Sequence, residues 1–234
     1  MTRTKKPELL FLHPLPLDGS MWAGQMDLLP GASHAPTLYG LGDTVEEWAT
    51  SVLKVVDGDR LIVVGCSVGG SCAIELAIAA PERVAALVLT GTKADLRPDP
   101  ELHAAALQML REQGVEKAWQ TYWAPLFSPS ADAGVVAAAK TIALGQSAEA
   151  ITRGVTAFHT RPSRSGLLPT VRCPVIVVVG ADDVAPGPKI SAAQAHSAPQ
   201  GRLHVIPDCG HYVPLERPER LNAILRGVIA DQVR

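Results

Sequence analysis

Residues 63–70 read Val-Val-Gly-Cys-Ser-Val-Gly-Gly, so an apolar run leads through a Gly-x-Ser-x-Gly turn into a helix-like stretch. A serine at so tight a turn takes a strained backbone conformation, and the residues two before and two after it must lack bulk. Gly65 and Gly69 meet that requirement. The turn therefore predicts that the Ser67 hydroxyl is exposed above a sheet edge, at the amino end of a helix whose N–H groups can face a developing negative charge.

Length and charge limit the number of domains and the kinds of partner that this sequence allows. The chain has 234 residues, which is typical of one main domain, and a formal net charge of −2 from 21 basic and 23 acidic residues. The chain has no run of basic residues that would bind nucleic acid or an anionic membrane, so a small-molecule partner fits better. The apolar stretch at residues 9–12 is too short for a signal segment or a membrane span, and we expect a cytoplasmic protein.

Short aliphatic runs alternate with helical patterns along much of the chain. This alternation predicts an α/β fold, in which helices cover both faces of a mainly parallel sheet of about six strands. A last helical pattern covers residues 217–228. The expected strands are residues 9–12, 61–64, 84–89, 175–179 and 203–206, with a weaker one at 33–38.

The strand signals stop between residues 98 and 161, where about four helical pieces are separated near Gly114, Pro129 and residues 145–147. This segment is rich in apolar and aromatic residues, which predicts a helical cap inserted into a core formed by residues 1–97 and 162–234. Alternatively, its aromatic residues only fill a core of their own. The candidate residues of a substrate pocket are His13, Trp119, Trp123, Phe127, Phe158 and Tyr212.

A serine hydroxyl needs a neighbouring base, itself oriented by a third group, to act as a nucleophile near neutral pH. Among the seven histidines, His211 lies in Pro-Asp-Cys-Gly-His-Tyr, directly after the last expected strand. Loops at the carboxyl ends of parallel strands hold the sites of such sheets, so His211 is the candidate base.

Three acids could orient that histidine. Asp182 and Asp183 follow the strand at residues 175–179, and Asp95 lies in the loop after the strand at 84–89. The residues themselves leave the choice among the three open.

The order Ser67, aspartate, His211, each just past a strand, resembles the α/β-hydrolase family, in which the Gly-x-Ser-x-Gly turn is the nucleophile elbow. Residues 11–22, which begin Phe-Leu-His-Pro-Leu-Pro, are similar to the family's His-Gly-x-Pro loop, and residues 69–84 to its nucleophile helix. The resemblance implies Asp183 as the acid, and the N–H groups of Leu15 and Val68 as the oxyanion hole.

Two departures from the family pattern accompany this resemblance. Pro14 replaces the usual glycine but leaves the N–H of Leu15 in place, and Pro16 stands where relatives often carry a cis proline. Only about eight residues precede the first expected strand, where relatives usually have an antiparallel hairpin. We therefore expect a sheet that lacks this hairpin.

The resemblance implies a serine hydrolase of the esterase or lactonase type that acts on an ester or lactone with an apolar or aromatic acyl part. Within this family, the sequence is similar to enol-lactonases, small carboxylesterases and cofactor-free haloperoxidases. A C–C bond hydrolase of ring-cleavage products and a non-hydrolytic binding protein are the alternatives. No cofactor, metal, nucleic acid or membrane is expected as a partner, whereas a homo-oligomer is possible.

Two further groups of residues bear on the site. Arg153, Arg161 and Arg164 could bind a substrate carboxylate, or could be solvated surface residues. The four cysteines lack the spacing of a zinc site or a redox pair, so we expect buried free thiols. One of them, Cys66, precedes the centre of the turn and is expected to point away from the cleft.

Overall fold

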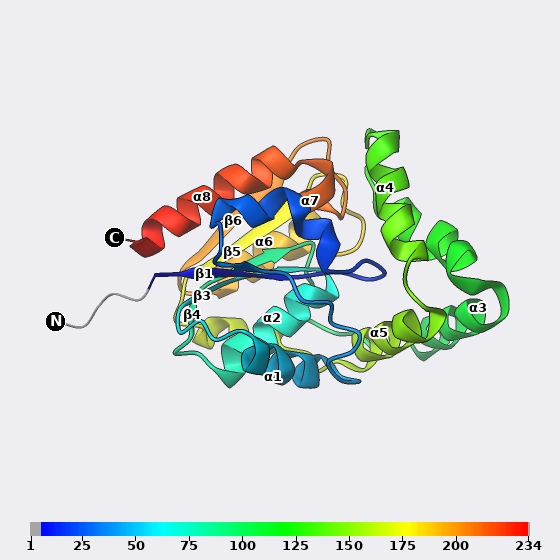
Figure 1. Cartoon of the computed structure of the whole chain (residues 1–234), viewed down its shortest axis with the longest axis horizontal. Coiled ribbons are helices and arrows are strands. Elements are labelled where there is room, and N and C mark those ends of the chain that lie inside the picture. The colour runs from blue at the N-terminus through cyan, green and yellow to red at the C-terminus, as the bar shows by residue number, and fades with distance from the viewer. Residues whose placement is uncertain (1–5, 234) are drawn as a thin grey trace.

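The computed structural model describes residues 6–233, and a six-stranded sheet runs through its centre (Figure 1). The strand order is β2-β1-β3-β4-β5-β6, and every neighbouring pair is parallel. The expected α/β fold is therefore confirmed, and no antiparallel hairpin occurs in this sheet within residues 6–233. The strands are β1 Glu8–Leu12, β2 Ser33–His34, β3 Leu61–Cys66, β4 Val84–Thr90, β5 Val175–Gly180 and β6 Gly201–Ile206.

Helices cover both faces of this sheet. Figure 1 shows α8 and η1 over one face, and α1 with α2 over the other. Helix α2 is buried at ten of its twelve residues, because it packs between the sheet and α1. These elements are η1 Gly19–Leu28, α1 Val45–Val55, α2 Val68–Ala79, η4 Ser165–Thr170, α6 Gly187–Ser197, α7 Val213–Glu216 and α8 Pro218–Val233.

The chain between β4 and β5 contains no strand and carries most of the remaining helices at one end of the sheet (Figure 1). We call residues 100–160 the helical segment. Breaks fall near the expected places, since Gly114 has non-helical torsions (φ 79°, ψ 179°) and Gly145 caps a helix end. The elements are α3 Pro100–Ala118, η2 Trp119–Trp123, η3 Ala124–Leu126, α4 Ala133–Leu144 and α5 Ala148–Thr160. Its status as a separate cap domain, residues 98–161, stays a prediction.

Two sequence-based boundaries differ from the structure. The strand expected at residues 33–38 is only two residues long, because Pro36 has no N–H to donate and the Leu38 N–H donates to His13 Nε2 instead, at 2.9 Å. The last helix continues to Val233 rather than residue 228, with Leu225 and Val228 still buried. No helix among the described residues is long and apolar enough to span a membrane.

Candidate active site

Ser67 occupies the turn between β3 and α2 in a conformation that side chains rarely adopt, with φ 54° and ψ −119°. Its N–H donates to Thr90 O at 2.9 Å, which fastens the turn to β4. The flanking glycines are required by close contacts: a β-carbon at Gly65 would lie 2.4 Å from Gly70 Cα, and one at Gly69 would lie 2.2 Å from Leu12 O. The backbone thus holds Ser67 at the amino end of α2, as the sequence predicts.

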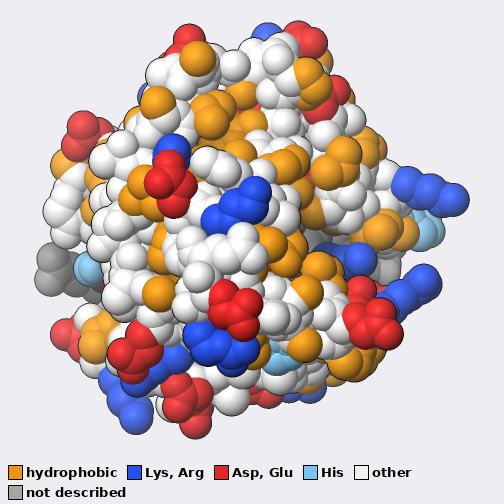
Figure 2. Space-filling model, turned by 90° about the vertical axis from the view of Figure 1, so that its right-hand side faces the viewer, with side chains coloured by type: hydrophobic (Ala, Val, Ile, Leu, Met, Phe, Trp, Pro, Cys, Tyr) orange, Lys and Arg blue, Asp and Glu red, His pale blue; other side chains and the backbone are white. Residues whose placement is uncertain are grey.

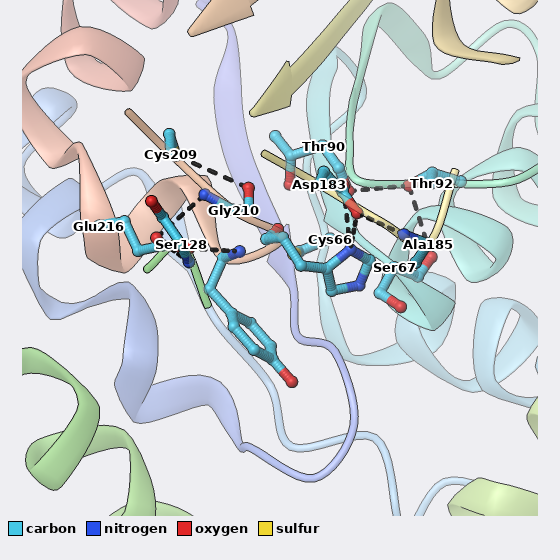
Figure 3. Close-up of polar contacts among 12 residues, drawn as sticks. Cys66, Ser67, Thr90, Thr92, Ser128, Asp183, Ala185, Cys209, Gly210 and Glu216 are labelled. Atoms are coloured by element: carbon cyan, nitrogen blue, oxygen red, sulfur yellow. Dashed lines mark hydrogen bonds and ion pairs between the residues drawn. The ribbon is translucent and has the colours of Figure 1, made fainter. Parts of the chain in front are cut away.

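His211 and Asp183 meet at the same edge of the sheet. His211 Nδ1 lies 3.0 Å from Asp183 Oδ2 and 3.1 Å from Oδ1, and both side chains are almost fully buried. Because a carboxylate only accepts hydrogen bonds, Nδ1–H is the donor in this contact, and in a neutral imidazole Nε2 then carries the free lone pair. Ala185 N–H donates to Asp183 Oδ1 at 2.8 Å and fixes the carboxylate (Figure 3).

The other two candidate acids have different partners. Asp182 Oδ2 accepts a hydrogen bond from the Ser128 hydroxyl at 2.6 Å, and Asp95 Oδ1 accepts one from the Ser163 hydroxyl at 2.6 Å. Of the three candidates, Asp183 alone is within hydrogen-bond distance of the imidazole of His211.

The two N–H groups expected to form an oxyanion hole have no acceptor within the part of the chain that the structure describes. Val68 is the first residue of α2, so its N–H belongs to the unpaired first turn and to the positive end of the helix dipole. Leu15 lines the same cavity as Ser67, and the Leu15–Pro16 peptide bond is cis.

A cavity of about 260 Å³ lies between this edge and the helical segment. Ser67 and His211 both line it, and Leu15, Leu126 and Val155 are among its apolar residues. A larger groove of about 760 Å³ lies elsewhere, beside the end of α2 and η4, and contains none of the candidate catalytic residues. We therefore take the smaller cavity as the candidate substrate site.

Two of the six residues expected in the pocket, Trp123 and Phe158, line this cavity. The other four are buried outside the lining: His13 is held by Leu38 N–H and by Pro14 O, and Trp119, Phe127 and Tyr212 pack on one another. The cavity is also lined by Tyr122, His159 and Leu102, whose spacing in the sequence did not mark them as pocket residues.

Glu216, which the sequence did not indicate, has a buried carboxylate that holds the loop carrying His211. Glu216 Oε2 accepts hydrogen bonds from Gly210 N at 3.0 Å and Ser128 N at 2.9 Å, and Oε1 accepts one from Tyr212 N at 3.1 Å (Figure 3). The backbone is thereby fixed on both sides of His211. The sequence feature that could have indicated Glu216 is an acidic residue in a short helix just after the candidate base.

Gly91, in the loop after β4, was also missed. It has φ +54°, and a β-carbon there would lie 2.9 Å from His211 Nδ1. The absence of a side chain at this position is what gives the imidazole its room.

The four cysteines are free, and three of them, Cys66, Cys72 and Cys209, are buried, whereas Cys173 is partly exposed. Burial raises the pKa of the Cys66 thiol to about 12, so the residue next to Ser67 stays protonated near neutral pH. Among the described residues, no group of three His, Cys, Asp or Glu side chains is placed to hold a metal ion.

Comparison with known proteins points to one family. The family model described as "Alpha/beta hydrolase family" matches residues 9–224. A pimeloyl-[acyl-carrier protein] methyl ester esterase from Aromatoleum aromaticum is 27% identical over 96% of this chain and 98% of its own length.

Two solved structures share the fold. A thermophilic esterase from Thermogutta terrifontis, determined with malate bound, superposes with a TM-score of 0.88 at 27% identity over 99% of this chain and 92% of that one. The enol-lactonase from Burkholderia xenovorans LB400 superposes with a TM-score of 0.82 at 18% identity over 98% and 94% of the two chains.

Proposed function

The chain belongs to the alpha/beta hydrolase family, and we propose that it hydrolyses a carboxylic ester or lactone with an apolar or aromatic acyl part, through Ser67, His211 and Asp183. One observation carries the proposal: the Asp183 carboxylate fixes the imidazole of His211 beside a cavity that this imidazole shares with Ser67. The esterase names of the relatives support ester hydrolysis at the level of the family.

In the first half of the cycle, Ser67 Oγ attacks the acyl carbon while His211 Nε2 accepts the hydroxyl proton. Asp183 keeps the proton on Nδ1 and stabilises the imidazolium that forms. The negative charge on the former carbonyl oxygen is met by the N–H groups of Leu15 and Val68. The tetrahedral intermediate then collapses, and the departing alkoxide takes the proton from His211, which leaves an acyl group on Ser67.

In the second half, His211 removes a proton from water, which attacks the acyl carbon through the same kind of intermediate. Ser67 leaves with the proton and the carboxylic acid is released, so one water is consumed for each ester bond broken. The mainly apolar lining near Leu126, Val155 and Phe158 favours an apolar acyl part.

The test combines a kinetic panel with a labelling experiment. The wild-type protein is assayed on p-nitrophenyl esters of graded acyl length, on lactones and on an enol-lactone, and Ser67→Ala is expected to lower kcat on the best substrate by about 10⁶-fold. A fluorophosphonate probe should label the wild-type protein at Ser67.

Near-normal activity of Ser67→Ala would overturn the mechanism. Turnover of vinylogous diketones without any turnover of esters would assign the site to C–C bond hydrolysis. Failure of the probe to label the folded protein would indicate a binding protein.

A further inference from the structure

His13 follows β1 directly and, although the sequence places it in the pocket, lies outside the cavity lining. Its side chain is fully buried. A buried polar ring costs free energy unless its nitrogen atoms have hydrogen-bond partners. One of the two partners of His13 is Pro14 O, which lies next to Leu15, the first expected donor of the oxyanion hole.

The contacts of the His13 imidazole define which nitrogen carries the proton. Leu38 N–H lies 2.9 Å from His13 Nε2, and because a backbone N–H only donates, Nε2 is the acceptor. Burial lowers the pKa of His13 to about 4, so the ring is neutral near pH 7. A neutral imidazole has one N–H, which is therefore on Nδ1 and donates to Pro14 O at 3.0 Å.

The carbonyl oxygen of Pro14 has a second donor in the same loop. Leu17 N–H donates to Pro14 O at 3.1 Å. A carbonyl oxygen has two lone pairs, so the two donors use its full capacity as an acceptor. The direction of the Pro14 carbonyl is thereby fixed from two sides, once by a side chain and once by the backbone.

The direction of the Pro14 carbonyl determines that of the Leu15 N–H, because both groups belong to one peptide unit. This unit is planar and trans, so its C=O and its N–H point in opposite directions. The donors that hold Pro14 O on one side therefore keep the Leu15 N–H on the other side. There it has no acceptor within the part of the chain that the structure describes.

The two prolines beside Leu15 restrict the loop further. Pro14 and Pro16 have no N–H, so Leu15 carries the only backbone donor of residues 14–16. Each proline also fixes its own φ and limits the torsions of the residue before it, which are those of His13 and Leu15. The loop thus offers a single donor and few ways to misplace it.

Leu15 is also held at its carbonyl and its side chain. Tyr212 Oη–H donates to Leu15 O at 3.4 Å, and a β-carbon at Gly154 in α5 would lie 2.6 Å from Leu15 Cδ2. Figure 2 faces the helical segment to which α5 belongs, where hydrophobic side chains lie among charged ones of both signs. Since Leu15 is only 8% exposed, its surroundings are set by the protein rather than by solvent.

We propose that His13 is a positioning residue for the hydrolysis: the imidazole, held by Leu38 N–H, fixes the Pro14 carbonyl so that the Leu15 N–H faces the oxyanion. This inference rests on the proposed function, because it concerns the oxyanion hole of the same site. A donor that is oriented before the reaction stabilises the developing charge without a cost of reorganisation. His13 does not line the cavity, so its effect is expected in kcat rather than in KM.

Two amide side chains separate the two contacts of the imidazole. The shorter asparagine can place its N–H₂ near the position of Nδ1 and donate to Pro14 O, whereas glutamine can place its carbonyl oxygen near Nε2 and accept from Leu38 N–H. Loss of a whole oxyanion-hole donor lowers kcat by about 10²–10³-fold. For a displaced donor, His13→Gln should lower kcat on the best p-nitrophenyl ester at least about tenfold, with KM within about threefold of wild type. In His13→Asn, kcat should be at least about fivefold higher than in His13→Gln.

His34→Gln is the matched control. His34 is a histidine of β2 that contacts Glu8 Oε2 at 2.8 Å and does not line the cavity, so the same substitution there should leave kcat at the wild-type value. Circular dichroism establishes that each variant is folded. An NMR spectrum of the ¹⁵N-labelled imidazoles gives a readout without turnover, in which His13 at pH 7 should be neutral and protonated on Nδ1.

A His13 ring protonated on Nε2 overturns the inference, because the contact with Pro14 O then lacks its proton. A kcat of folded His13→Gln within about twofold of wild type overturns it as well, and so does His13→Asn that is as slow as His13→Gln. These results leave an active wild-type protein and so leave the proposed function intact. If the wild-type protein hydrolyses no ester, the proposed function fails, and the role of His13 fails with it.

Discussion

The substitution Glu216→Gln tests how the loop of His211 is held. The glutamine has the same size, but its one carbonyl oxygen can replace only one of the two carboxylate oxygens, and its amide N–H₂ then faces a backbone N–H of the loop. Hydrogen bonds to a charged group contribute about 1.5–3 kcal/mol each, against about 0.5–1.5 kcal/mol for neutral ones. Since Glu216 accepts three of them and is only 6% exposed, we expect a loss of about 3 kcal/mol or more in the free energy of unfolding.

The same substitution should slow the chemistry. Gly210 and Tyr212, on either side of His211, each donate to Glu216, so their release lets the imidazole move relative to Ser67. A misplacement of about 1 Å costs about 100-fold in rate, and this loss should appear in kcat rather than in KM, because Glu216 does not line the cavity.

Urea unfolding and steady-state hydrolysis of the best p-nitrophenyl ester measure the two effects separately. Glu75→Gln is the matched control, because Glu75 is an equally buried carboxylate whose partner, Arg164, lies at the start of η4 and forms its side-chain hydrogen bonds with Glu75. It should lower stability and leave kcat near the wild-type value. If folded Glu216→Gln keeps kcat within about twofold of wild type, Glu216 does not position His211 and the reasoning is refuted.

Two further predictions concern His211 and His13. Gly91→Ala places a β-carbon 2.9 Å from His211 Nδ1 and should lower kcat/KM at least about tenfold. The control Gly31→Ala, also at positive φ but without a contact, should lower only stability. If both variants have the same kcat/KM, the steric argument is contradicted. Burial lowers the pKa of His13 to about 4, from 6.5 for an ordinary histidine. The neutral, buried imidazole therefore contributes its full stabilisation above pH 6.5. This stabilisation is lost as pH falls toward 4, by about 3 kcal/mol in all. Urea unfolding at pH 7 and 4.5 should show a smaller pH dependence for His13→Gln, and an equal dependence would refute this assignment.

The sheet was largely predictable because its central strands are continuous apolar runs. Strands β3 and β5 are buried at every residue, and the β-branched side chains that make them so are visible in the sequence. β2 was overestimated because a tertiary contact, the hydrogen bond from Leu38 to His13, draws the chain away from the strand. Such a contact has no local signature.

The candidate site was predictable where local geometry defines it and less so elsewhere. The turn at Ser67 needs Gly65 and Gly69, and both glycines are visible in the sequence. Asp182 and Asp183 are neighbours in one turn, so spacing could not separate them; the structure pairs one with Ser128 and the other with His211.

The aromatic residues of the helical segment illustrate a second limit. Trp119 and Trp123 are both buried, yet only Trp123 lines the cavity. Helical spacing predicts that a side chain is buried but not which surface it is buried against, because that depends on how the segment packs on the sheet.

Residues 126–128 link the helical segment to the loops of both His211 and Asp183. Leu126 O accepts the N–H of His211 at 2.9 Å, and Ser128 donates through its N–H to Glu216 and through its hydroxyl to Asp182, which precedes Asp183. One wall of the cavity and the contact between His211 and Asp183 therefore depend on the same stretch of backbone. A change in the packing of the helical segment that reaches these residues should alter kcat together with specificity, because the imidazole and its carboxylate cannot remain in place when the backbone that holds both loops moves.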